Sequence, residues 1–329
     1  MAIRFGLLGA GRIGQTHAKA VDSNDDAVIV AVADPIEAAA QSIADKFNAD
    51  INAIDEIAAR DDVDAVIICT PTDMHADLIE QFARAGKAIF CEKPIDLNVE
   101  RVKSCLKTVE ETGALLMVGF NRRFDPHFAA MRHAIQQGQI GTPEMGVIIS
   151  RDPAAPPADY ITRSGGLFRD MMIHDFDMGV FLMGDMPVKV QASGSVLTDP
   201  QIKELGDVDS ANAILTWEDG RQVSISNSRR ASYGYDQRIE MHGAKGMISA
   251  ENQRPISVEI ASADGFTKPP LHDFFMTRYL DAYAAEIASF VHALKTGTAD
   301  IPVGIDGLNA LLLAEAALKS ATTGEAVYL

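Results

Sequence analysis

Acidic and imidazole groups gather within residues 165–179, which read GGLFRDMMIHDFDMG. On a single helix, Asp170 and His174 are four residues apart and would share one face. A histidine titrates near neutral pH and can take a proton from a hydroxyl group, while a nearby aspartate can bind substrate or fix the imidazole tautomer. The alternative for His174 is a buried structural histidine. We expect Asp175 and Asp177, which lie on other faces, at the helix surface or in hydrogen bonds between domains.

A glycine motif lies close to the start of the chain. Gly9-Ala10-Gly11-Arg12-Ile13-Gly14 fits G-x-G-x-x-G, follows a predicted strand and opens a predicted helix. Such a turn brings the backbone close to a pyrophosphate, and the helix N-terminus adds oriented N–H groups and a partial positive charge. The motif therefore predicts a dinucleotide site.

The second strand pattern ends at Asp34, about twenty residues past the last glycine, where an acid commonly binds the adenosine ribose. A carboxylate at this position repels a 2′-phosphate, so the sequence favours NAD over NADP. Capping of the following helix is an alternative role for Asp34, and the two roles are compatible.

Two further tripeptides end strand patterns: Thr70-Pro71-Thr72 and Glu92-Lys93-Pro94. Ligands of doubly wound sheets bind beyond the carboxyl ends of the strands, so we expect both tripeptides beside the cofactor. His75 follows the first tripeptide and either approaches the cofactor or caps and packs. Near a positive nicotinamide, Lys93 could have a lowered pKa and share a proton relay or hold a substrate oxygen. A surface ion pair between Glu92 and Lys93 is the alternative.

The first 120 residues alternate strand and helix patterns, which predicts a doubly wound parallel α/β (Rossmann) domain over 1–120. Residues 121–329 form the second predicted domain, for substrate binding and oligomerisation, with a large open, mainly antiparallel sheet flanked by helices. Its hairpin signals are ANAILTWEDGRQVSISNS and RIEMHGAKGMISAE. The predicted strands are IRFGLLG, VIVAVAD, DAVIICT, KAIFCEKP and LLMVGF, and the predicted helices are 12–21, 36–47, 74–85, 99–111, 126–137, 274–295 and 304–320.

Composition excludes several classes of function. The net charge of −17 argues against a nucleic-acid partner, and no apolar run has the length of a membrane helix. The three cysteines have no CxxC spacing, the histidines have no HExxH spacing, and no G-x-S-x-G elbow occurs, so we expect neither a metal site nor hydrolase chemistry. The first residues lead directly into a strand pattern, which favours a cytoplasmic protein.

GAGRIG at the start, EKP at a strand end and GG-x₃-D-x₃-H-D together resemble the glucose–fructose oxidoreductase and inositol dehydrogenase family (Gfo/Idh/MocA). Runs such as ICTPTDMHADLIEQFARAGKAIFCEKPIDL and SNSRRASYGYDQRIE are similar to the inositol dehydrogenases of that family, and the resemblance covers essentially the whole chain. It implies NAD-dependent oxidation of a cyclic polyol, myo-inositol, to the 2-keto compound in inositol catabolism by a homotetramer. The alternatives are a dehydrogenase of another inositol isomer, a dehydrogenase of an aldose such as glucose, and a non-catalytic NAD-binding regulator.

The resemblance also assigns roles to individual residues. The family's catalytic lysine, aspartate and histidine match Lys93, Asp170 and His174, and it implies a cis peptide between Lys93 and Pro94. Polyol contacts are implied for the segment that begins with Asn121 and Arg122, for Arg151 and Asp152, and for Tyr233 and Tyr235.

Overall fold

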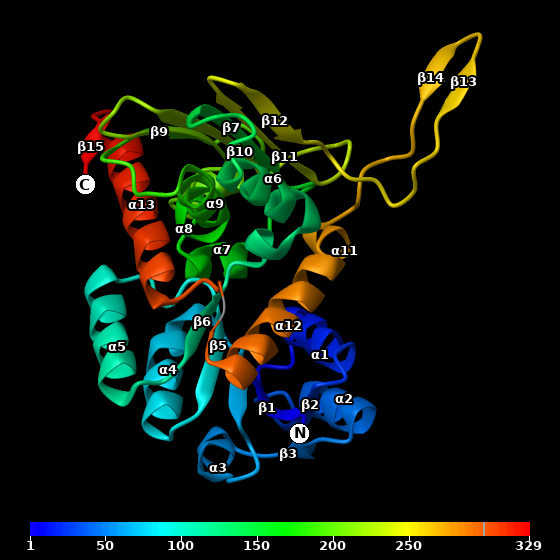
Figure 1. Cartoon of the computed structure of the whole chain (residues 1–329), viewed down its shortest axis with the longest axis vertical. Coiled ribbons are helices and arrows are strands. Elements are labelled where there is room, and N and C mark those ends of the chain that lie inside the picture. Colours follow the sequence, from blue (N-terminus) through cyan, green and yellow to red (C-terminus); the bar gives the residue numbers. More distant parts are fainter. Residues whose placement is uncertain (299) are drawn as a thin grey trace. The chain divides into compact units, whose positions relative to one another are not determined.

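The computed structural model describes residues 1–298 and 300–329, which divide into two compact units (Figure 1). The first unit comprises Met1–Phe124 with Leu280–Leu311, and the second comprises Asp125–Tyr279 with Leu312–Leu329. The first boundary, between residues 124 and 125, lies near the predicted one at residue 120, and residues 280–311, which the predicted ranges assign to the second domain, belong to the first unit.

The first unit is built on a six-stranded, entirely parallel sheet in the order β3-β2-β1-β4-β5-β6. Its central strands are buried on both faces because helices cover both sides, which explains their continuous apolar runs. The five predicted strands are all present, and β3 is an additional two-residue strand. The strands are β1 (Ile3–Leu8), β2 (Ala27–Ala33), β3 (Asp50–Ile51), β4 (Ala65–Ile68), β5 (Ala88–Glu92) and β6 (Leu116–Gly119).

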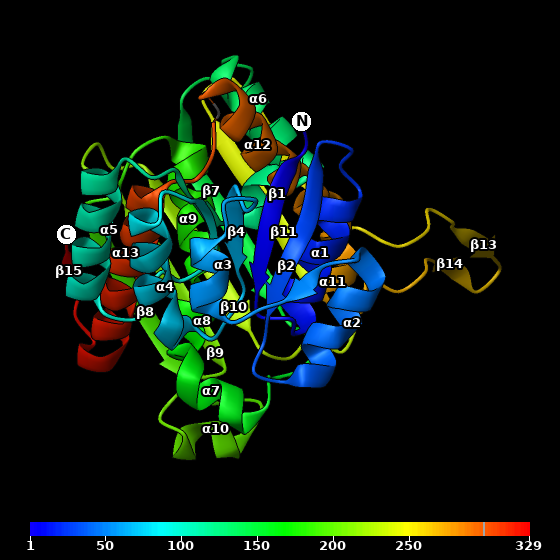
Figure 2. The same cartoon turned by 90° about the horizontal axis from the view of Figure 1, so that it is seen from below.

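The helices of the first unit form two groups. Helix α1 packs against α12, and α4 packs against α5 (Figures 1 and 2). Because β1, β4 and β5 are neighbours in the sheet, the glycine motif and the two tripeptides follow adjacent strand ends. The elements are α1 (Arg12–Asp22), α2 (Glu37–Phe47), α3 (Ile54–Ala59), η1 (Thr72–Met74), α4 (His75–Arg84), α5 (Val99–Thr112), η2 (Asn121–Phe124), α12 (Leu280–Thr296) and the first part of α13 (Gly304–Thr323).

The second unit contains a seven-stranded sheet in the order β12-β11-β7-β10-β9-β8-β15. All its neighbouring pairs are antiparallel except β7 with β10, so the predicted open, mainly antiparallel sheet is confirmed. Both predicted hairpins are present, as β9–β10 and β11–β12. The strands are β7 (Pro143–Arg151), β8 (Lys189–Ser195), β9 (Ser210–Thr216), β10 (Gln222–Ser228), β11 (Asp236–Gly243), β12 (Gly246–Ala250) and β15 (Val327–Tyr328), with a separate hairpin of β13 (Ile260–Ser262) and β14 (Gly265–Thr267).

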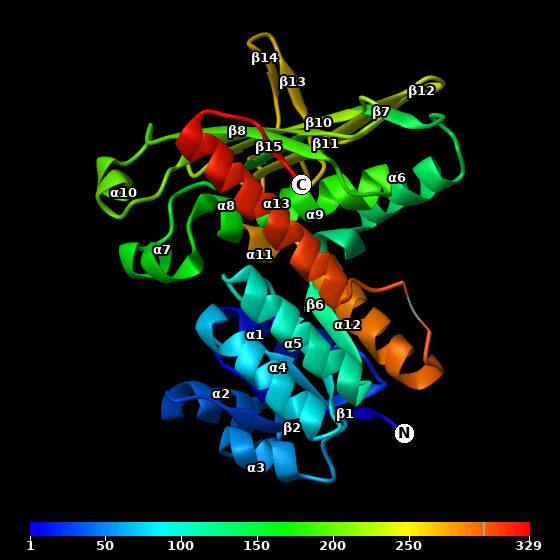
Figure 3. The same cartoon turned by 90° about the vertical axis from the view of Figure 1, so that its left-hand side faces the viewer.

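Helices lie against one face of this sheet, as Figure 3 shows for α6, α8 and α9. The single helix predicted around Asp170 and His174 is in fact two short helices, α8 and α9, with Met171 and Met172 between them. In the part of the chain that the structure describes, no helix has the length and apolarity of a membrane span. The helices of the second unit are α6 (Pro126–Gln136), α7 (Ala158–Ser164), α8 (Leu167–Asp170), α9 (Ile173–Met183), α10 (Pro200–Glu204), α11 (Phe275–Arg278) and the rest of α13.

Candidate active site

The three glycines of the motif differ in what surrounds them. Gly9 has φ +93°, and a Cβ there would lie 2.6 Å from the carbonyl oxygen of Cys69. A Cβ on Gly14 would lie 2.0 Å from the carbonyl oxygen of Gly9, so α1 can approach the end of β1 only without a side chain there. A Cβ on Gly11 would meet no atom within 4 Å. The backbone at Gly11 is therefore open to a ligand at the N-terminus of α1, as a pyrophosphate requires.

Asp34 is hydrogen-bonded to this glycine turn. Its Oδ2 accepts a hydrogen bond from the backbone N–H of Ala10 at 2.6 Å, and its Oδ1 accepts one from the N–H of Ile36 at 2.8 Å. Asp34 thus ties the glycine turn to the start of α2, which is the structural role that the sequence left open. The bond to Ala10 also holds the carboxylate beside the glycine turn.

His75 joins the two predicted tripeptides. Its ring is 2% exposed, with Nδ1 2.8 Å from the carbonyl oxygen of Pro94 and Nε2 2.8 Å from that of Thr70. Burial lowers the pKa of His75, although both carbonyl oxygens favour the charged form. His75 therefore positions the chain after β4 and β5, and its direct contact with a cofactor stays a prediction.

The strand end at Glu92 faces the interior. The peptide bond between Lys93 and Pro94 is cis, as predicted, and Lys93 is half-buried. The Oε1 atom of Glu92 lies 2.6 Å from Nε2 of His17, whose side chain is fully buried against the ring of Phe90. Glu92 is therefore partly buried and bound to His17 within the first unit.

In the second unit, Asp170 ends α8 and His174 lies in the first turn of α9. Both side chains are half-buried. The hydroxyl of Tyr160 donates a hydrogen bond to Oδ1 of Asp170 at 2.9 Å, and Oδ2 of Asp170 lies 3.5 Å from Nη2 of Arg229. Asp170 is therefore held from two sides, by a hydroxyl donor and by a guanidinium group.

Asp175 and Asp177 are both buried, at 0% and 3% exposed, so the expectation of a helix surface is wrong. Asp175 accepts hydrogen bonds from Ser150 at 2.5 Å and from Asn227 at 2.8 Å, on β7 and β10. These bonds lie within the second unit and attach the first turn of α9 to the sheet. Asp175 thus fixes the element that carries His174.

Two of the predicted substrate residues of the second unit, Arg151 and Tyr233, are linked and partly exposed. Arg151 donates from Nη1 to the hydroxyl of Tyr233 at 3.1 Å, and that hydroxyl donates to Oδ2 of Asp236 at 2.5 Å. Burial raises the pKa of Tyr233, and its bond to Asp236 raises it further. Asp152 directly follows Arg151 and is half-buried. Tyr235 is only 4% exposed, with its ring against Tyr279.

The remaining two predicted substrate residues belong to the first unit. Asn121 and Arg122 lie in η2 and are each 4% exposed. Both residues are therefore buried within an ordered turn.

Sequence reasoning missed three ionisable residues of the two units: His17, Glu286 and Arg229, at 0%, 0% and 1% exposed. Glu286 stands in the apolar run AYAAEIASF, where a lone acid is a usable signal, because buried acids are rare. His17 and Arg229 lack such a signal, since both look like surface residues of ordinary amphipathic patterns. Residues 1–298 and 300–329 contain no group of three His, Cys, Asp or Glu side chains placed to hold a metal ion.

Comparison with known proteins defines the class. Residues 3–120 match the family model described as oxidoreductase family, NAD-binding Rossmann fold, and residues 128–249 match the GFO/IDH/MocA C-terminal domain. The chain belongs to the Gfo/Idh/MocA oxidoreductase family, whose Rossmann domain binds NAD.

Individual relatives cover the full length. An inositol 2-dehydrogenase of Rhizobium meliloti is 64% identical over 97% of each chain. A myo-inositol 2-dehydrogenase of Thermotoga maritima is 42% identical over 97% of this chain and 96% of its own. The crystal structure of a myo-inositol dehydrogenase from Corynebacterium glutamicum superposes with a TM-score of 0.96 at 44% identity, covering 100% of this chain and 99% of that one.

Proposed function

We propose that the protein is an NAD-dependent dehydrogenase that oxidises myo-inositol to 2-keto-myo-inositol (scyllo-inosose). The observation that carries this proposal is the 64% identity, over 97% of both chains, with an inositol 2-dehydrogenase. The open backbone at Gly11, beside the carboxylate of Asp34, supports NAD as the cofactor. Lys93, Asp170 and His174 supply the polar groups that alcohol oxidation requires.

Oxidation of a secondary alcohol removes a hydride from carbon and a proton from oxygen. NAD supplies the hydride acceptor. In our proposal His174 takes the hydroxyl proton and passes it to water, and Asp170 orients the substrate or the imidazole. Lys93 holds the substrate oxygen and shares the proton transfer. The proposal requires that the two units bring Lys93 and His174 to the same substrate.

The proposed cofactor contacts lie in the first unit. The N-terminal turn of α1 (Gly9, Gly11, Arg12, Ile13 and Gly14) receives the pyrophosphate, and Asp34 accepts hydrogen bonds from the ribose. The segments after β4 and β5 complete the contacts, through Thr70, Pro71, Thr72, His75, Glu92 and Lys93. The fixed backbone around His75 supports this arrangement, because it holds both segments in place before any ligand binds.

The proposed polyol contacts are Asn121, Arg122, Arg151, Asp152, Tyr233 and Tyr235. The linked group of Arg151, Tyr233 and Asp236 is suited to this role, because its hydroxyl and guanidinium can each bond to a sugar-like hydroxyl. Since Tyr235 is 4% exposed, we assign it mainly to shaping the surface beside Tyr233.

The central test is the substitution Lys93→Met. We expect kcat with myo-inositol to fall by about 10³-fold, because the variant loses a group that acts on the reacting oxygen. The Kd for NAD, measured by calorimetry, should change little, because the glycine turn and Asp34 remain. Lys107→Met, at an exposed position on α5, is the matched control and should behave as wild type. Retention of turnover by Lys93→Met would refute the assigned chemistry.

The substrate and the coenzyme are tested on the unmodified protein. Steady-state rates with myo-inositol, scyllo-inositol and glucose, each with NAD and NADP, should be highest with myo-inositol and NAD. A preference for another polyol would reassign the substrate, and NAD binding without any turnover would indicate a regulator. A preference for NADP would contradict the role proposed for Asp34.

We further propose that the protein acts in inositol catabolism in the cytoplasm. The three cysteines are free thiols and all are buried, which fits a reducing compartment. Subcellular fractionation of cells grown on myo-inositol tests both points. We expect NAD-dependent inositol oxidation in the soluble fraction, and its absence there would contradict the assignment.

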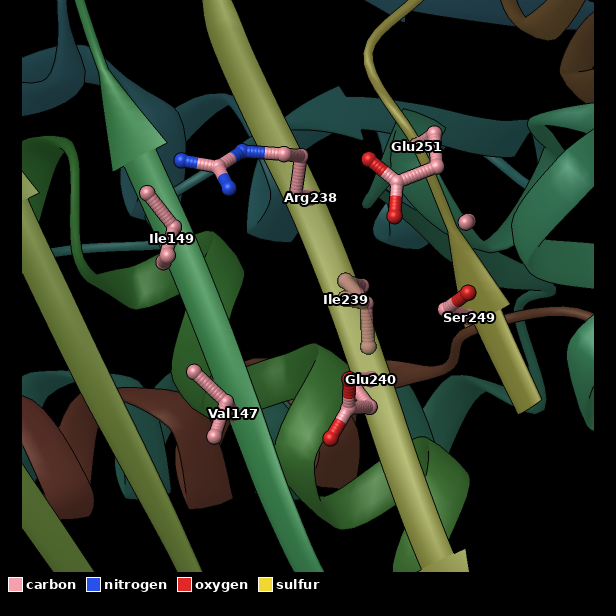
Figure 4. Close-up of a pocket in the computed structure, with 8 residues that line it drawn as sticks. Val147, Ile149, Arg238, Ile239, Glu240, Ser249 and Glu251 are labelled. Atoms are coloured by element: carbon pink, nitrogen blue, oxygen red, sulfur yellow. The ribbon is translucent and has the colours of Figure 1, made fainter. Parts of the chain in front are cut away.

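We also propose a homotetramer that associates through the open face of the second sheet. This face carries the exposed apolar side chains Met145, Val147, Ile214 and Met247, at 59%, 41%, 41% and 50% exposed. Figure 4 shows a hollow on this face, where Val147 and Ile149 of β7 lie beside Arg238 and Glu240 of β11. Apolar side chains rimmed by polar ones are typical of a protein interface.

A further inference from the structure

Arg229 follows β10 and carries a guanidinium group in the interior of the second unit. The residue is 1% exposed, and in the described part of the chain neither Nε nor Nη2 has a hydrogen-bond partner. A buried cation is costly unless opposite charges lie close to it. Two carboxylates meet this need, because Nη2 lies 3.5 Å from Oδ2 of Asp170 and 3.9 Å from Oδ2 of Asp207. Arg229 therefore sits between the acid assigned to the reaction and a second acid.

Asp207 is hydrogen-bonded to the start of α8. Its Oδ1 accepts a hydrogen bond from the backbone N–H of Leu167, the first residue of that helix, at 3.0 Å. Gly166, with φ +82°, passes so close that a Cβ would lie 2.6 Å from the same oxygen. Asp207 thus fixes the N-terminus of the helix that ends at Asp170, while its other oxygen faces Arg229.

The backbone of Arg229 is also fixed. Its N–H donates to the carbonyl oxygen of Asp209 at 2.8 Å, and the carboxylate of Asp209 accepts backbone hydrogen bonds from Leu197, Thr198 and Asp199. Burial would raise the pKa of Asp209, but these bonds lower it to about 2. The backbone that carries the guanidinium is therefore anchored by the end of β10 and by this loop.

We propose that Arg229 is a positioning residue for Asp170. Its charge attracts one oxygen of the Asp170 carboxylate and, together with the Tyr160 hydroxyl on the other oxygen, fixes the direction of that carboxylate at the end of α8. At 3.5 Å the contact acts through charge more than through a hydrogen bond. Asp207 competes for the same cation and balances its charge. This inference rests on the proposed function, which assigns Asp170 to the reaction.

The proposal is tested by two substitutions with opposite expected effects on the pH profile of kcat/KM. Arg229→Met removes the cation, so the acid limb should move to higher pH by about one unit, with kcat reduced about tenfold. Asp207→Asn keeps the acceptor for Leu167 but removes the competing charge, so the acid limb should move to lower pH. Thermal unfolding and the Kd for NAD are measured in parallel, and the Kd for NAD should stay close to wild type in Asp207→Asn.

The groups around Asp170 define the controls. The ionisable groups that contact Asp170, pair with its partner or lie near it in the chain include Tyr160 on α7, Arg229, Asp207, His174 on α9, and Arg169, which pairs with Glu315 on α13. Arg230→Met, an exposed neighbour in the chain, should leave kcat and the pH profile unchanged. Arg229→Lys retains the charge and should restore the position of the acid limb.

Several outcomes would overturn the inference. These are a folded Arg229→Met variant with the wild-type profile, or acid limbs that move in the same direction in Arg229→Met and Asp207→Asn. If Arg229→Met does not fold, the test rests on Asp207→Asn. An acid limb of kcat/KM at the wild-type pH in that variant counts against the proposal. Absence of inositol oxidation by the wild-type protein would refute the proposed function itself, which is a separate result.

Discussion

The carboxyl group of Glu286 lies fully buried on α12, beside the pair formed by Glu92 and His17. In the part of the chain that the structure describes, neither of its oxygens has a hydrogen-bond partner. Burial raises the pKa of Glu286 well above its ordinary value, and the negative charge of Glu92 raises it further. An ionised carboxylate would be severely destabilised here, so Glu286 keeps its proton at pH values where exposed glutamates have lost theirs.

This state predicts a pH-dependent stability. The folded chain retains a proton that the unfolded chain releases above about pH 4.3. The contribution of Glu286 to the free energy of unfolding is therefore fully present below that pH. It is lost as the pH rises towards the folded pKa, with a slope of about 1.4 kcal/mol per pH unit. The variant Glu286→Gln has no carboxyl proton at this position. Its free energy of unfolding should therefore increase relative to that of the wild type as the pH increases.

Urea unfolding at a series of pH values from 4 upwards measures this difference. Glu110→Gln, at an exposed position on α5, is the matched control and should follow the wild-type curve. Parallel curves for Glu286→Gln and wild type would show that Glu286 is ionised in the folded protein.

At the scale of elements, the glycine turn offers a pair of substitutions that separates folding from binding. Gly14→Ala places a Cβ 2.0 Å from the carbonyl oxygen of Gly9, so α1 must move away from β1. We expect a loss of about 2 kcal/mol or more in the free energy of unfolding. Gly11→Ala meets no atom within 4 Å and should leave the folded protein as stable as wild type, yet weaken NAD binding at least tenfold by filling the space left for the pyrophosphate.

Denaturant unfolding and calorimetric titration with NAD measure the two effects. Wild-type NAD affinity in Gly11→Ala would place the pyrophosphate elsewhere and contradict the cofactor site. Unchanged stability of Gly14→Ala would show that the contact between α1 and β1 can relax.

Most long elements are predictable from the sequence, for reasons that differ between the two units. The parallel strands are buried on both faces and leave apolar runs, and the hairpin β9–β10 is marked by Asp219-Gly220, with Gly220 at φ +91°. Strand β3 and helix α3 are too short to show a period. The helical periodicity of α12 predicts an apolar face but does not indicate which of the two units this face packs against.

The site is predictable to a lesser extent. Spacing alone places Asp170 and His174 on one helix, whereas the chain forms two helices, α8 and α9, with Met171 and Met172 between them. Buried pairs such as Glu92 with His17, or Arg229 with Asp170, join residues 75 and 59 positions apart in the chain. No local pattern records a contact of that range, so only the folded chain reveals it.

At the scale of the whole molecule, a net charge of −17 favours solubility and opposes association through a charged surface. The open face of the second sheet is different, because Met145, Val147 and Ile149 of β7 lie next to uncharged residues of β10 in the strand register, although Glu240 of β11 lies on the other side of Val147. Uncharged and apolar side chains thus dominate its middle. An assembly of this acidic chain should therefore form where its own charge is weakest.

Val147→Asp tests this assembly. Val147 is 41% exposed in the single chain, so an aspartate there should leave each chain folded. In a tetramer built through this face, the new carboxylate would be buried next to Glu240 and a like charge of the neighbouring copy, which disfavours association. Light scattering after size-exclusion chromatography should give four chains for wild type and fewer for Val147→Asp. Leu197→Asp, on an exposed loop, should remain tetrameric. A wild-type monomer would refute the tetramer, and a tetrameric Val147→Asp would move the interface to another surface.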